Sequence, residues 1–155
     1  LGSGEYMFEN FFAEMQTAYP GKAAVRIGFI PDLARKIYSG ADAFLMPSKS
    51  EPCGLAQMVA ARYGTLPIVR ETGGLKDSIQ DMGEDLEGNG FTFKTYNAHD
   101  MLGAIDRCSG LYYNRELWPK AVQKTMESDF TWGRSANEYI GMYRHICGEE
   151  KEKEN

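Results

Sequence analysis

Short apolar segments alternate with segments of helical periodicity along this chain, and no other feature limits its fold as strongly. Runs that are typical of strands lie at 24–29, 43–46, 66–69 and 91–93. Segments with the spacing of helices lie at 6–18, 31–40, 54–63, 75–82, 98–108, 114–127 and 131–147. Repeated strand–helix units predict an α/β fold in which helices cover both faces of a parallel sheet.

The apolar side chains of these segments predict where the core lies. The run 43–46 is apolar throughout and ends at Pro47, which is typical of a central strand that is buried on both faces. Aromatic and Met side chains recur every three or four positions in 6–18, so they are expected to pack in the core. Leu33 and Ile37 mark the expected inner face of the helix that follows.

Composition fits a globular domain and excludes several classes of function. The chain has 155 residues, of which 43% are hydrophobic and 25% charged, and its formal net charge is −5. Nucleic acid and anionic lipid repel an acidic chain, so neither is expected as a partner. No apolar run approaches the ~20 residues that a membrane helix needs. Three scattered cysteines predict a reducing, cytoplasmic location, and neither of the two histidines has zinc-ligand spacing to a cysteine, so no metal site is expected.

The predicted elements all lie within residues 1–147, which we expect to form part of one domain, with the helices after residue 98 as its cap or extension. Residues 148–155 are a run of charges without a core side chain and are expected to be disordered. The chain opens at Leu1, without an initiator Met, on what reads as the end of a strand. We therefore expect it to be a fragment of a longer protein.

Ligands of parallel sheets bind beyond the carboxyl ends of the strands. The turns after Phe29, Met46 and Val69 are therefore predicted to share one rim, where function is to be sought. Phe29 directly follows its predicted strand. Its ring either stacks on a nucleotide base or packs in the core, and the residues alone leave both interpretations open.

The loop from Pro47 to Leu55 has the most distinctive chemistry on that rim. Gly54 stands at the entry of a helix, whose first N–H groups lack partners and suit a phosphate or a hydroxyl. Glu51 can accept hydrogen bonds from hydroxyl groups but repels phosphate. Together they predict a ligand with a sugar at one side and a phosphate at the other. A structural interpretation also stays open, in which Glu51 only offsets the helix dipole and Cys53 packs.

The turn Thr72–Gly74 repeats this arrangement after the strand 66–69. Thr72 can cap the next helix, and the two glycines expose backbone N–H groups. A purely structural turn is the alternative.

Two stretches of the chain, 41–55 and 62–77, contain Glu-Pro-Cys-Gly-Leu, Arg-Tyr-Gly-Thr-Leu-Pro and Thr-Gly-Gly-Leu. They resemble the donor-site segment of glycogen and starch synthases, and shorter landmarks at 89–93 and 129–132 are similar to the same family. The resemblance covers all of the chain but the acidic tail. It implies a Rossmann-like fold, as the C-terminal half of a two-domain glycosyltransferase of the GT-B type.

The resemblance also implies an activity. Enzymes of this family transfer glucose, with retention, from ADP-glucose or UDP-glucose to the non-reducing end of an α-1,4-glucan, and they require neither metal nor cofactor. The acceptor glucan would be held by the N-terminal domain, which this chain lacks. The implied location is the cytoplasm, or the plastid for a plant starch synthase.

Site residues follow from the resemblance position by position. Glu51 would be the catalytic-site carboxylate that holds the transferred glucose, and Phe29 would lie against the base. The backbone groups that would contact the sugar or the diphosphate belong to Cys53, Gly54, Leu55, Ala56, Thr72, Gly73 and Gly74.

The chain also departs from related enzymes. Val59 stands where many two-domain retaining transferases have a second Glu, which favours the glycogen and starch synthase branch. The Arg and Lys that clamp phosphate in the family lie upstream, and we interpret Lys49, Arg70 and Lys76 as surface charges. The chain by itself is therefore expected to bind donor weakly and to catalyse little or nothing. Two alternatives stay open: a non-catalytic nucleotide-binding module, and the donor domain of another transferase such as a sucrose synthase relative.

Overall fold

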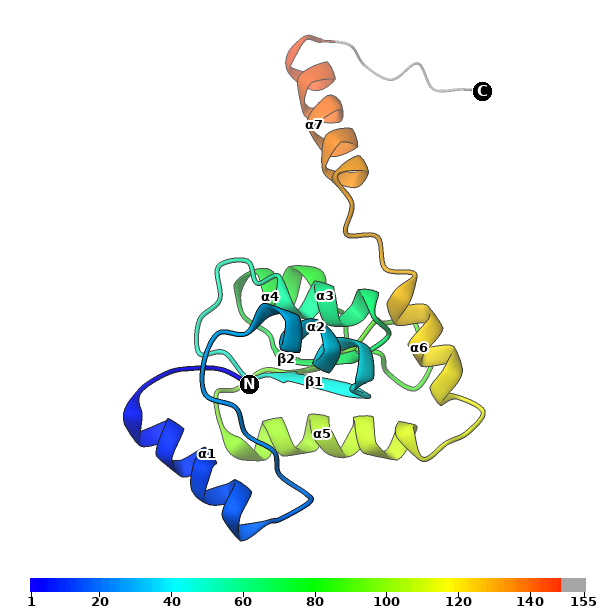
Figure 1. The fold of residues 1–155 in the computed structure, drawn as a ribbon. Coiled ribbons are helices and arrows are strands. Elements are labelled where there is room, and N and C mark those ends of the chain that lie inside the picture. Colours follow the sequence, from blue (N-terminus) through cyan, green and yellow to red (C-terminus); the bar gives the residue numbers. More distant parts are fainter. Residues whose placement is uncertain (149–155) are drawn as a thin grey trace. The chain divides into compact units, whose positions relative to one another are not determined.

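The computed structural model describes residues 1–148, which divide into two compact units (Figure 1). The first unit, Leu1–Ala41, contains α1 (Tyr6–Ala18) and α2 (Pro31–Gly40). The second begins at Asp42 and contains β1 (Ala43–Met46), α3 (Ala56–Arg62), β2 (Leu66–Arg70), α4 (Gly73–Ser78), β3 (Phe91–Phe93), α5 (Ala98–Tyr112), α6 (Trp118–Met126) and α7 (Trp132–Ile146).

Two of the expectations for the whole chain stay predictions. The assignment of residues 1–147 to a single domain is one of them. The predicted disordered tail is the other, because all of it beyond Gly148 lies outside the described residues. No helix in the described part is long and apolar enough to cross a membrane.

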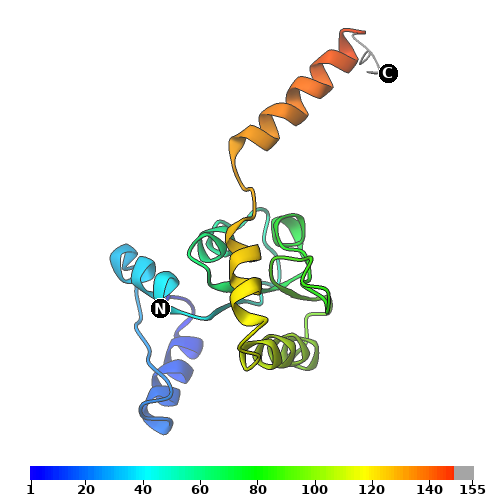
Figure 2. The same ribbon diagram turned by 90° about the vertical axis from the view of Figure 1, so that its right-hand side faces the viewer.

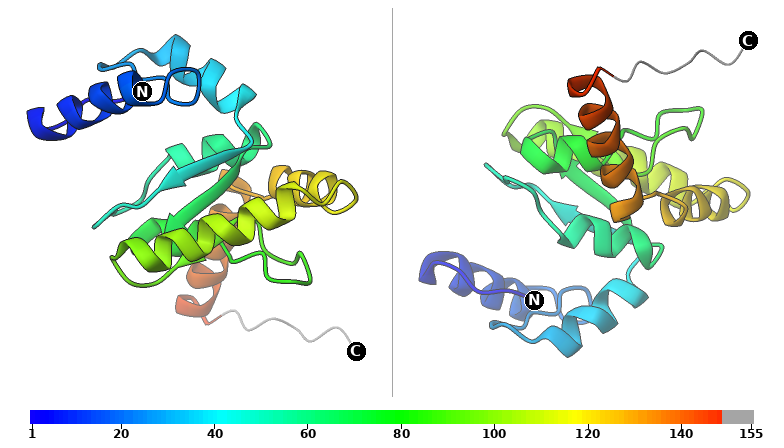
Figure 3. Two further views of the ribbon diagram at one scale, coloured as in Figure 1. Left: turned by 90° about the horizontal axis from the view of Figure 1, so that it is seen from below. Right: turned by 90° about the horizontal axis from the view of Figure 1, so that it is seen from above.

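A parallel sheet forms the centre of the second unit, and within the described residues it has three strands in the order β1-β2-β3. Ala43 of β1 pairs with Leu66 of β2, and Ile68 of β2 pairs with Phe91 of β3. The strands lie side by side in Figure 3. The predicted parallel sheet is therefore confirmed.

Helices cover both faces of this sheet. Figures 1 and 2 show α5 on one face and α3 and α4 on the other. On the α5 side, Leu66 and Ile68 pack with Phe91, Phe93 and buried residues of α5 and α6. On the α4 side, Val69 packs with Leu75 and Ile79. These two apolar layers confirm the predicted α/β class.

The strand β1 lies at the edge of the sheet, so the prediction of a central strand buried on both faces is wrong. Among the described residues it pairs only with β2, and Leu45 is 41% exposed. The central strand is β2, in which Leu66 and Val69 are fully buried. Both strands are apolar throughout, and such a pattern does not reveal which of them has a neighbour on each side.

Residues 24–29 do not form the predicted strand. Ile27 makes an isolated parallel bridge to Gly2, with hydrogen bonds from Gly2 N–H to Arg26 O (3.1 Å) and from Gly28 N–H to Gly2 O (2.8 Å). A strand needs a ladder of successive pairs, and here the ladder stops after one bridge.

The helices of the first unit have the predicted bounds but not the predicted burial. No residue of α1 or α2 is buried, and Phe8, Phe11 and Phe12 are each at least half exposed. Within the described residues the expected core packing of these aromatic side chains is therefore wrong. Periodicity identifies the apolar face of a helix, whereas burial also needs an element to cover that face.

Several helix boundaries differ from those predicted. The helix α4 begins at Gly73 and ends at Ser78 instead of running from 75 to 82. Beyond Ser78 the chain pairs with the segment directly before β3. Met82 N–H donates to Gly90 O at 2.7 Å, and Gln80 N–H donates to Asn89 Oδ1 at 2.8 Å. These tertiary hydrogen bonds replace the helical ones and end the helix early.

Candidate functional site

The turns that follow β1 and β2 come together at one rim of the sheet. Met46 and Val69 are paired at the ends of these parallel strands, so the loops after them start side by side. The N–H of Gly74 donates to the carbonyl oxygens of Glu51 and Pro52, both at 3.2 Å. The structure therefore brings together the two loops that contain the candidate residues 51–56 and 72–74.

Phe29 belongs to the first unit and is 90% exposed, so the interpretation of its ring as a core residue is wrong. Stacking of this ring against a nucleotide base stays a prediction.

The glycine pair permits the close approach of these loops. A Cβ atom at Gly73 would lie 2.0 Å from the carbonyl oxygen of Glu51, and one at Gly74 would lie 2.2 Å from that of Cys53. Gly73 also has a φ of +44°, which side chains disfavour. Thr72 takes the N-cap position of α4, but its side chain makes no capping hydrogen bond. The Thr72–Gly74 turn therefore has a structural role, which is the alternative that the sequence left open. Contact of this turn with phosphate stays a prediction.

Gly54 and the start of α3 present backbone donors. The first hydrogen bond of this helix runs from Val59 N–H to Leu55 O at 2.9 Å. The N–H groups of residues 55–58 therefore have no partner within the helix. Gly54 has a φ of +73°, a conformation that favours glycine at the entry of this helix. Because α3 has only seven residues, we attribute any affinity for anions to individual N–H groups rather than to the helix dipole.

The side chains of Glu51 and Cys53 are available to a ligand. Glu51 is half-buried, and its carboxylate makes no hydrogen bond or ion pair with another residue of the described chain. Cys53 is exposed, and within residues 1–148 its Sγ has one hydrogen-bond partner, the oxygen of Gly54 at 3.6 Å. The alternative in which Cys53 packs is therefore not supported.

Arg70 has a role in this site that its sequence context did not indicate. Its Nε donates to the carbonyl oxygen of Ser48 at 2.8 Å, and its Nη2 donates to that of Lys49. The guanidinium carbon also lies 5.6 Å from the centre of the Tyr96 ring. Arg70 is therefore not the surface charge that was expected, because it holds the start of the loop 47–55. The only signal in the sequence is its position at the end of β2, directly before the second loop.

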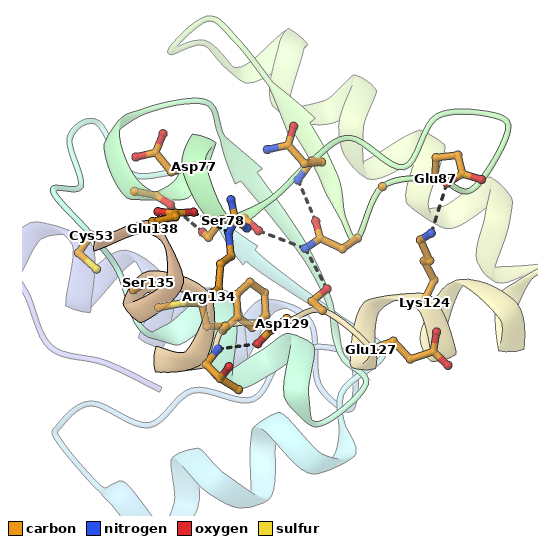
Figure 4. Close-up of a pocket in the computed structure, with 18 of the residues that line it drawn as sticks. Cys53, Asp77, Ser78, Glu87, Lys124, Glu127, Asp129, Arg134, Ser135 and Glu138 are labelled. Carbon is orange, nitrogen blue, oxygen red and sulfur yellow. Dashed lines mark hydrogen bonds and ion pairs between the residues drawn. The ribbon is translucent and has the colours of Figure 1, made fainter. Parts of the chain in front are cut away.

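A polar cavity of about 850 Å³ adjoins these loops through Pro52, Cys53 and Gly74 (Figure 4). Most of its charged side chains are carboxylates: Asp77, Glu87, Glu127, Asp129 and Glu138. Its two cations are already paired, Lys124 Nζ with Glu87 Oε2 at 3.3 Å and Arg134 Nε with Glu138 Oε1 at 3.2 Å. Phosphate is repelled by such a lining, so the cavity does not suit the diphosphate side of a ligand.

No three His, Cys, Asp or Glu side chains within residues 1–148 are grouped in a way that could hold a metal ion. The prediction that the protein works without metal or cofactor stays untested.

Most of the chain is similar to one protein family and to named enzymes. The family described as "Glycosyl transferases group 1" matches residues 3–124. Relatives named glycogen synthase, from Geobacillus thermodenitrificans, Geobacillus stearothermophilus and Anoxybacillus flavithermus, are 52%, 51% and 53% identical to it over 97%, 97% and 94% of this chain. The chain spans only 31%, 31% and 30% of the length of these relatives.

Two solved structures resemble this one. The catalytic domain of starch synthase IV from Arabidopsis thaliana, bound to ADP and acarbose, matches with a TM-score of 0.78 and 36% identity, over 93% of this chain and 31% of that chain. Sucrose-phosphate synthase from Thermosynechococcus elongatus matches with a TM-score of 0.56 and 22% identity, over 91% of this chain and 35% of that chain. The second likeness shows the fold alone.

Proposed function

This chain belongs to the glycosyl transferases group 1 family, and from that membership we propose that it is the nucleotide-sugar-binding part of an α-1,4-glucan synthase. The whole protein would transfer glucose from ADP-glucose or UDP-glucose to the non-reducing end of glycogen or starch, with retention. The relatives named glycogen synthase support this proposal. The acceptor glucan would be held by parts of the protein outside this chain, which spans about a third of those relatives.

One observation supports the location of the donor site more than any other. The hydrogen bonds from Gly74 N–H to the oxygens of Glu51 and Pro52 join two loops that resemble the donor-site motifs of this family. As far as the described residues show, the Glu51 carboxylate without a partner and the free N–H groups at the start of α3 then lie within one short segment, 51–58. A sugar diphosphate needs both kinds of group at neighbouring positions.

The proposed chemistry divides the donor between these groups. The Glu51 carboxylate accepts hydrogen bonds from glucose hydroxyls and stabilises the positive charge that develops on the sugar. Backbone N–H groups at Cys53, Gly54, Leu55 and Ala56 receive the sugar and the diphosphate. The Thr72–Gly74 turn lies on the phosphate side, where Gly73 N–H is the available donor, because Thr72 N–H donates to Arg70 O and Gly74 N–H to the oxygens of Glu51 and Pro52. Negative charge grows on the diphosphate as it leaves, so fixed donors at this position lower the barrier. Phe29 stacks on the base, and no metal or cofactor takes part.

A chimera tests the activity. This chain replaces the matching segment of the Geobacillus stearothermophilus glycogen synthase, and transfer of labelled glucose to glycogen is measured from ADP-glucose and from UDP-glucose. We expect the chimera to be active with at least one donor. Glu51→Ala is expected to lower kcat about 100-fold, because the transition state loses an electrostatic contact.

Glu84→Ala, which removes an exposed carboxylate outside the site, is the matched control and is expected to leave kcat unchanged. An active chimera that tolerates Glu51→Ala would favour a non-catalytic role for this residue and contradict the proposal. Fructose offered as acceptor in the same assay distinguishes a sucrose synthase relative. The cytoplasmic location stays a prediction of the sequence.

A further inference from the structure

A glutamine on α3 is buried beneath the first loop of the candidate site. Gln57 is 0% exposed. Its Nε2 donates to the carbonyl oxygens of Cys53 at 3.2 Å and Gly54 at 2.9 Å, and to Ser78 Oγ on α4 at 3.1 Å. One amide group thus contacts both the end of the loop 47–55 and the helix that follows the second loop.

Ser78 continues this connection to the second loop. Its Oγ accepts from Gln57 and donates to the carbonyl oxygen of Gly74 at 2.6 Å. The N–H of Gly74 in turn donates to the carbonyl oxygen of Glu51. A closed series of hydrogen bonds therefore runs from the first loop through Gln57 and Ser78 to Gly74 and back.

The contacts to Cys53 and Gly54 also orient the neighbouring N–H groups. A trans peptide is planar, so its C=O and N–H point in opposite directions. Because the oxygens of Cys53 and Gly54 face Gln57, the N–H groups of the same two peptides, those of Gly54 and Leu55, point away from it. These are backbone donors that the proposed function assigns to the sugar and the diphosphate.

Stability of the core does not explain a glutamine at this position. The Oε1 atom of Gln57 is buried and has no hydrogen-bond partner within the described residues. Exchanging the two amide atoms would set Oε1 against the carbonyl oxygens of Cys53 and Gly54, so the orientation is fixed. A buried acceptor without a partner is unfavourable, and an apolar side chain of the same shape would avoid that cost. The Nε2 contacts are therefore what the glutamine contributes.

We propose that Gln57 is a positioning residue for donor binding, which turns the N–H groups of Gly54 and Leu55 outward and holds the two loops together through Ser78. This inference rests on the proposed function, since it requires that these N–H groups bind the donor. Glycine at position 54 fits the same arrangement. A Cβ there would lie 2.6 Å from Gln57 Oε1, so a larger residue would push the Gln57 side chain out of its place against the loop.

The test uses the 155-residue chain, labelled with ¹⁵N and titrated with ADP and with ADP-glucose. In the wild type we expect the amide signals of Gly54 and Leu55 to shift on binding. Gln57→Met keeps the length of the side chain but removes its donors. It is expected to raise the Kd about tenfold, the effect of about one lost hydrogen bond.

Two further variants separate positioning from stability. Ser78→Ala removes the hydroxyl that joins Gln57 to Gly74 but leaves the contacts of Gln57 with Cys53 and Gly54 in place. It is expected to raise the Kd by a smaller factor, which keeps the test decisive if Gln57→Met does not fold. Thr125→Val is the matched control, because Thr125 is fully buried and its hydroxyl donates to Asn89 O at 3.1 Å, outside the site. It is expected to lower the unfolding temperature while leaving the Kd unchanged.

The outcomes are distinguishable. A wild-type chain whose Gly54 and Leu55 signals do not respond to either ligand would overturn the proposed function and this inference with it. A wild type that binds, with Gln57→Met or Ser78→Ala binding as tightly, would overturn the inference alone. An equal loss of affinity in Thr125→Val would also overturn it, since stability would then be the cause.

Discussion

Arg70 and Gln57 hold the loop 47–55 at its two ends, and neither of them is among the residues expected to touch the ligand. Arg70 donates to carbonyl oxygens at the start of the loop, and Gln57 donates to those at its end. The second loop contacts the middle of the first through Gly74. Glu51 thus lies in a loop whose backbone is held by hydrogen bonds at three places. The side chain of Glu51 itself has no partner in the described chain. A loop held in this way loses little conformational entropy when it binds a ligand.

Asp81 leads to a prediction about pH at the scale of single residues. Burial raises the pKa of its carboxyl group, but hydrogen bonds from the N–H groups of Thr92 and Gly83, together with the charge of Arg107, outweigh burial and leave the pKa lowered from 3.8. A carboxyl group whose pKa is lowered in the folded state stabilises the fold above its unfolded pKa. This stabilisation is lost as the pH falls through the folded pKa.

The free energy of unfolding is therefore expected to fall more steeply below about pH 4 in the wild type than in Asp81→Asn. Urea titrations at a series of pH values measure this. Arg107→Met removes the charged partner at 2.7 Å and should weaken the same acid dependence. Identical pH profiles for the wild type and Asp81→Asn would contradict this assignment.

At the scale of elements, helices and loops depend on contacts that local sequence does not show. The helix α4 is short because residues 79–82 pair with the segment before β3 instead of continuing the helix. Its N-cap residue, Thr72, makes no capping hydrogen bond, and its first two residues are glycines that lie against the loop 47–55. Because glycine has no Cβ, Gly73 and Gly74 allow the backbone of α4 to contact the backbone of the loop 47–55.

Two glycine substitutions are expected to act in opposite directions. Gly74→Ala would set a Cβ 2.2 Å from the oxygen of Cys53, so the loops must separate, and we expect a loss of about 2 kcal/mol or more in the free energy of unfolding. Gly103→Ala lies within α5, where the new Cβ would have nothing within 4 Å beyond the neighbouring backbone of its own helix, and should add about 0.5–1 kcal/mol because alanine favours the helix. Chemical denaturation measures both, and a stabilising Gly74→Ala would contradict the packing of the two loops.

At the scale of the whole molecule, the acidic character of the chain opposes the ligand that we propose. The net charge is −5, and the guanidinium group of Arg70 is engaged with carbonyl oxygens of the loop 47–55. Binding of ADP to this chain alone would therefore depend on backbone donors acting against a repulsive field.

Salt is accordingly expected to strengthen the binding of ADP to this chain. Raising the ionic strength from about 0.05 M to about 0.5 M shortens the range of the repulsion and leaves hydrogen bonds to backbone N–H groups in place. We expect the Kd for ADP in NMR titrations to fall about twofold. A Kd that rises with salt would instead indicate a cationic clamp within this chain, formed by residues such as Lys49 or Lys76.

Much of the fold could be predicted because it depends on local patterns. The segments 6–18, 31–40 and 43–46 have the predicted bounds, since periodicity and the residues Pro and Gly mark their ends. The capping of α5 is also local, because Asn97 Oδ1 accepts from Asp100 N–H at 2.9 Å. The prediction of a strand at 24–29 was wrong, because the formation of a strand depends on a partner strand and not on its own residues alone.

The sequence by itself determined the alternation of strands and helices, the family, and the two loops in which the candidate site residues lie, because periodicity and motifs are properties of neighbouring residues. Only the tertiary structure decided that β1 is an edge strand and that Arg70 and Gln57 hold the first loop. The contacts that hold this loop join residues far apart in the sequence. Arg70 lies 22 positions after Ser48, and Ser78 lies 21 positions after Gln57. Such pairs meet only after β1 and β2 have paired in the parallel sheet and brought the segments that follow them together.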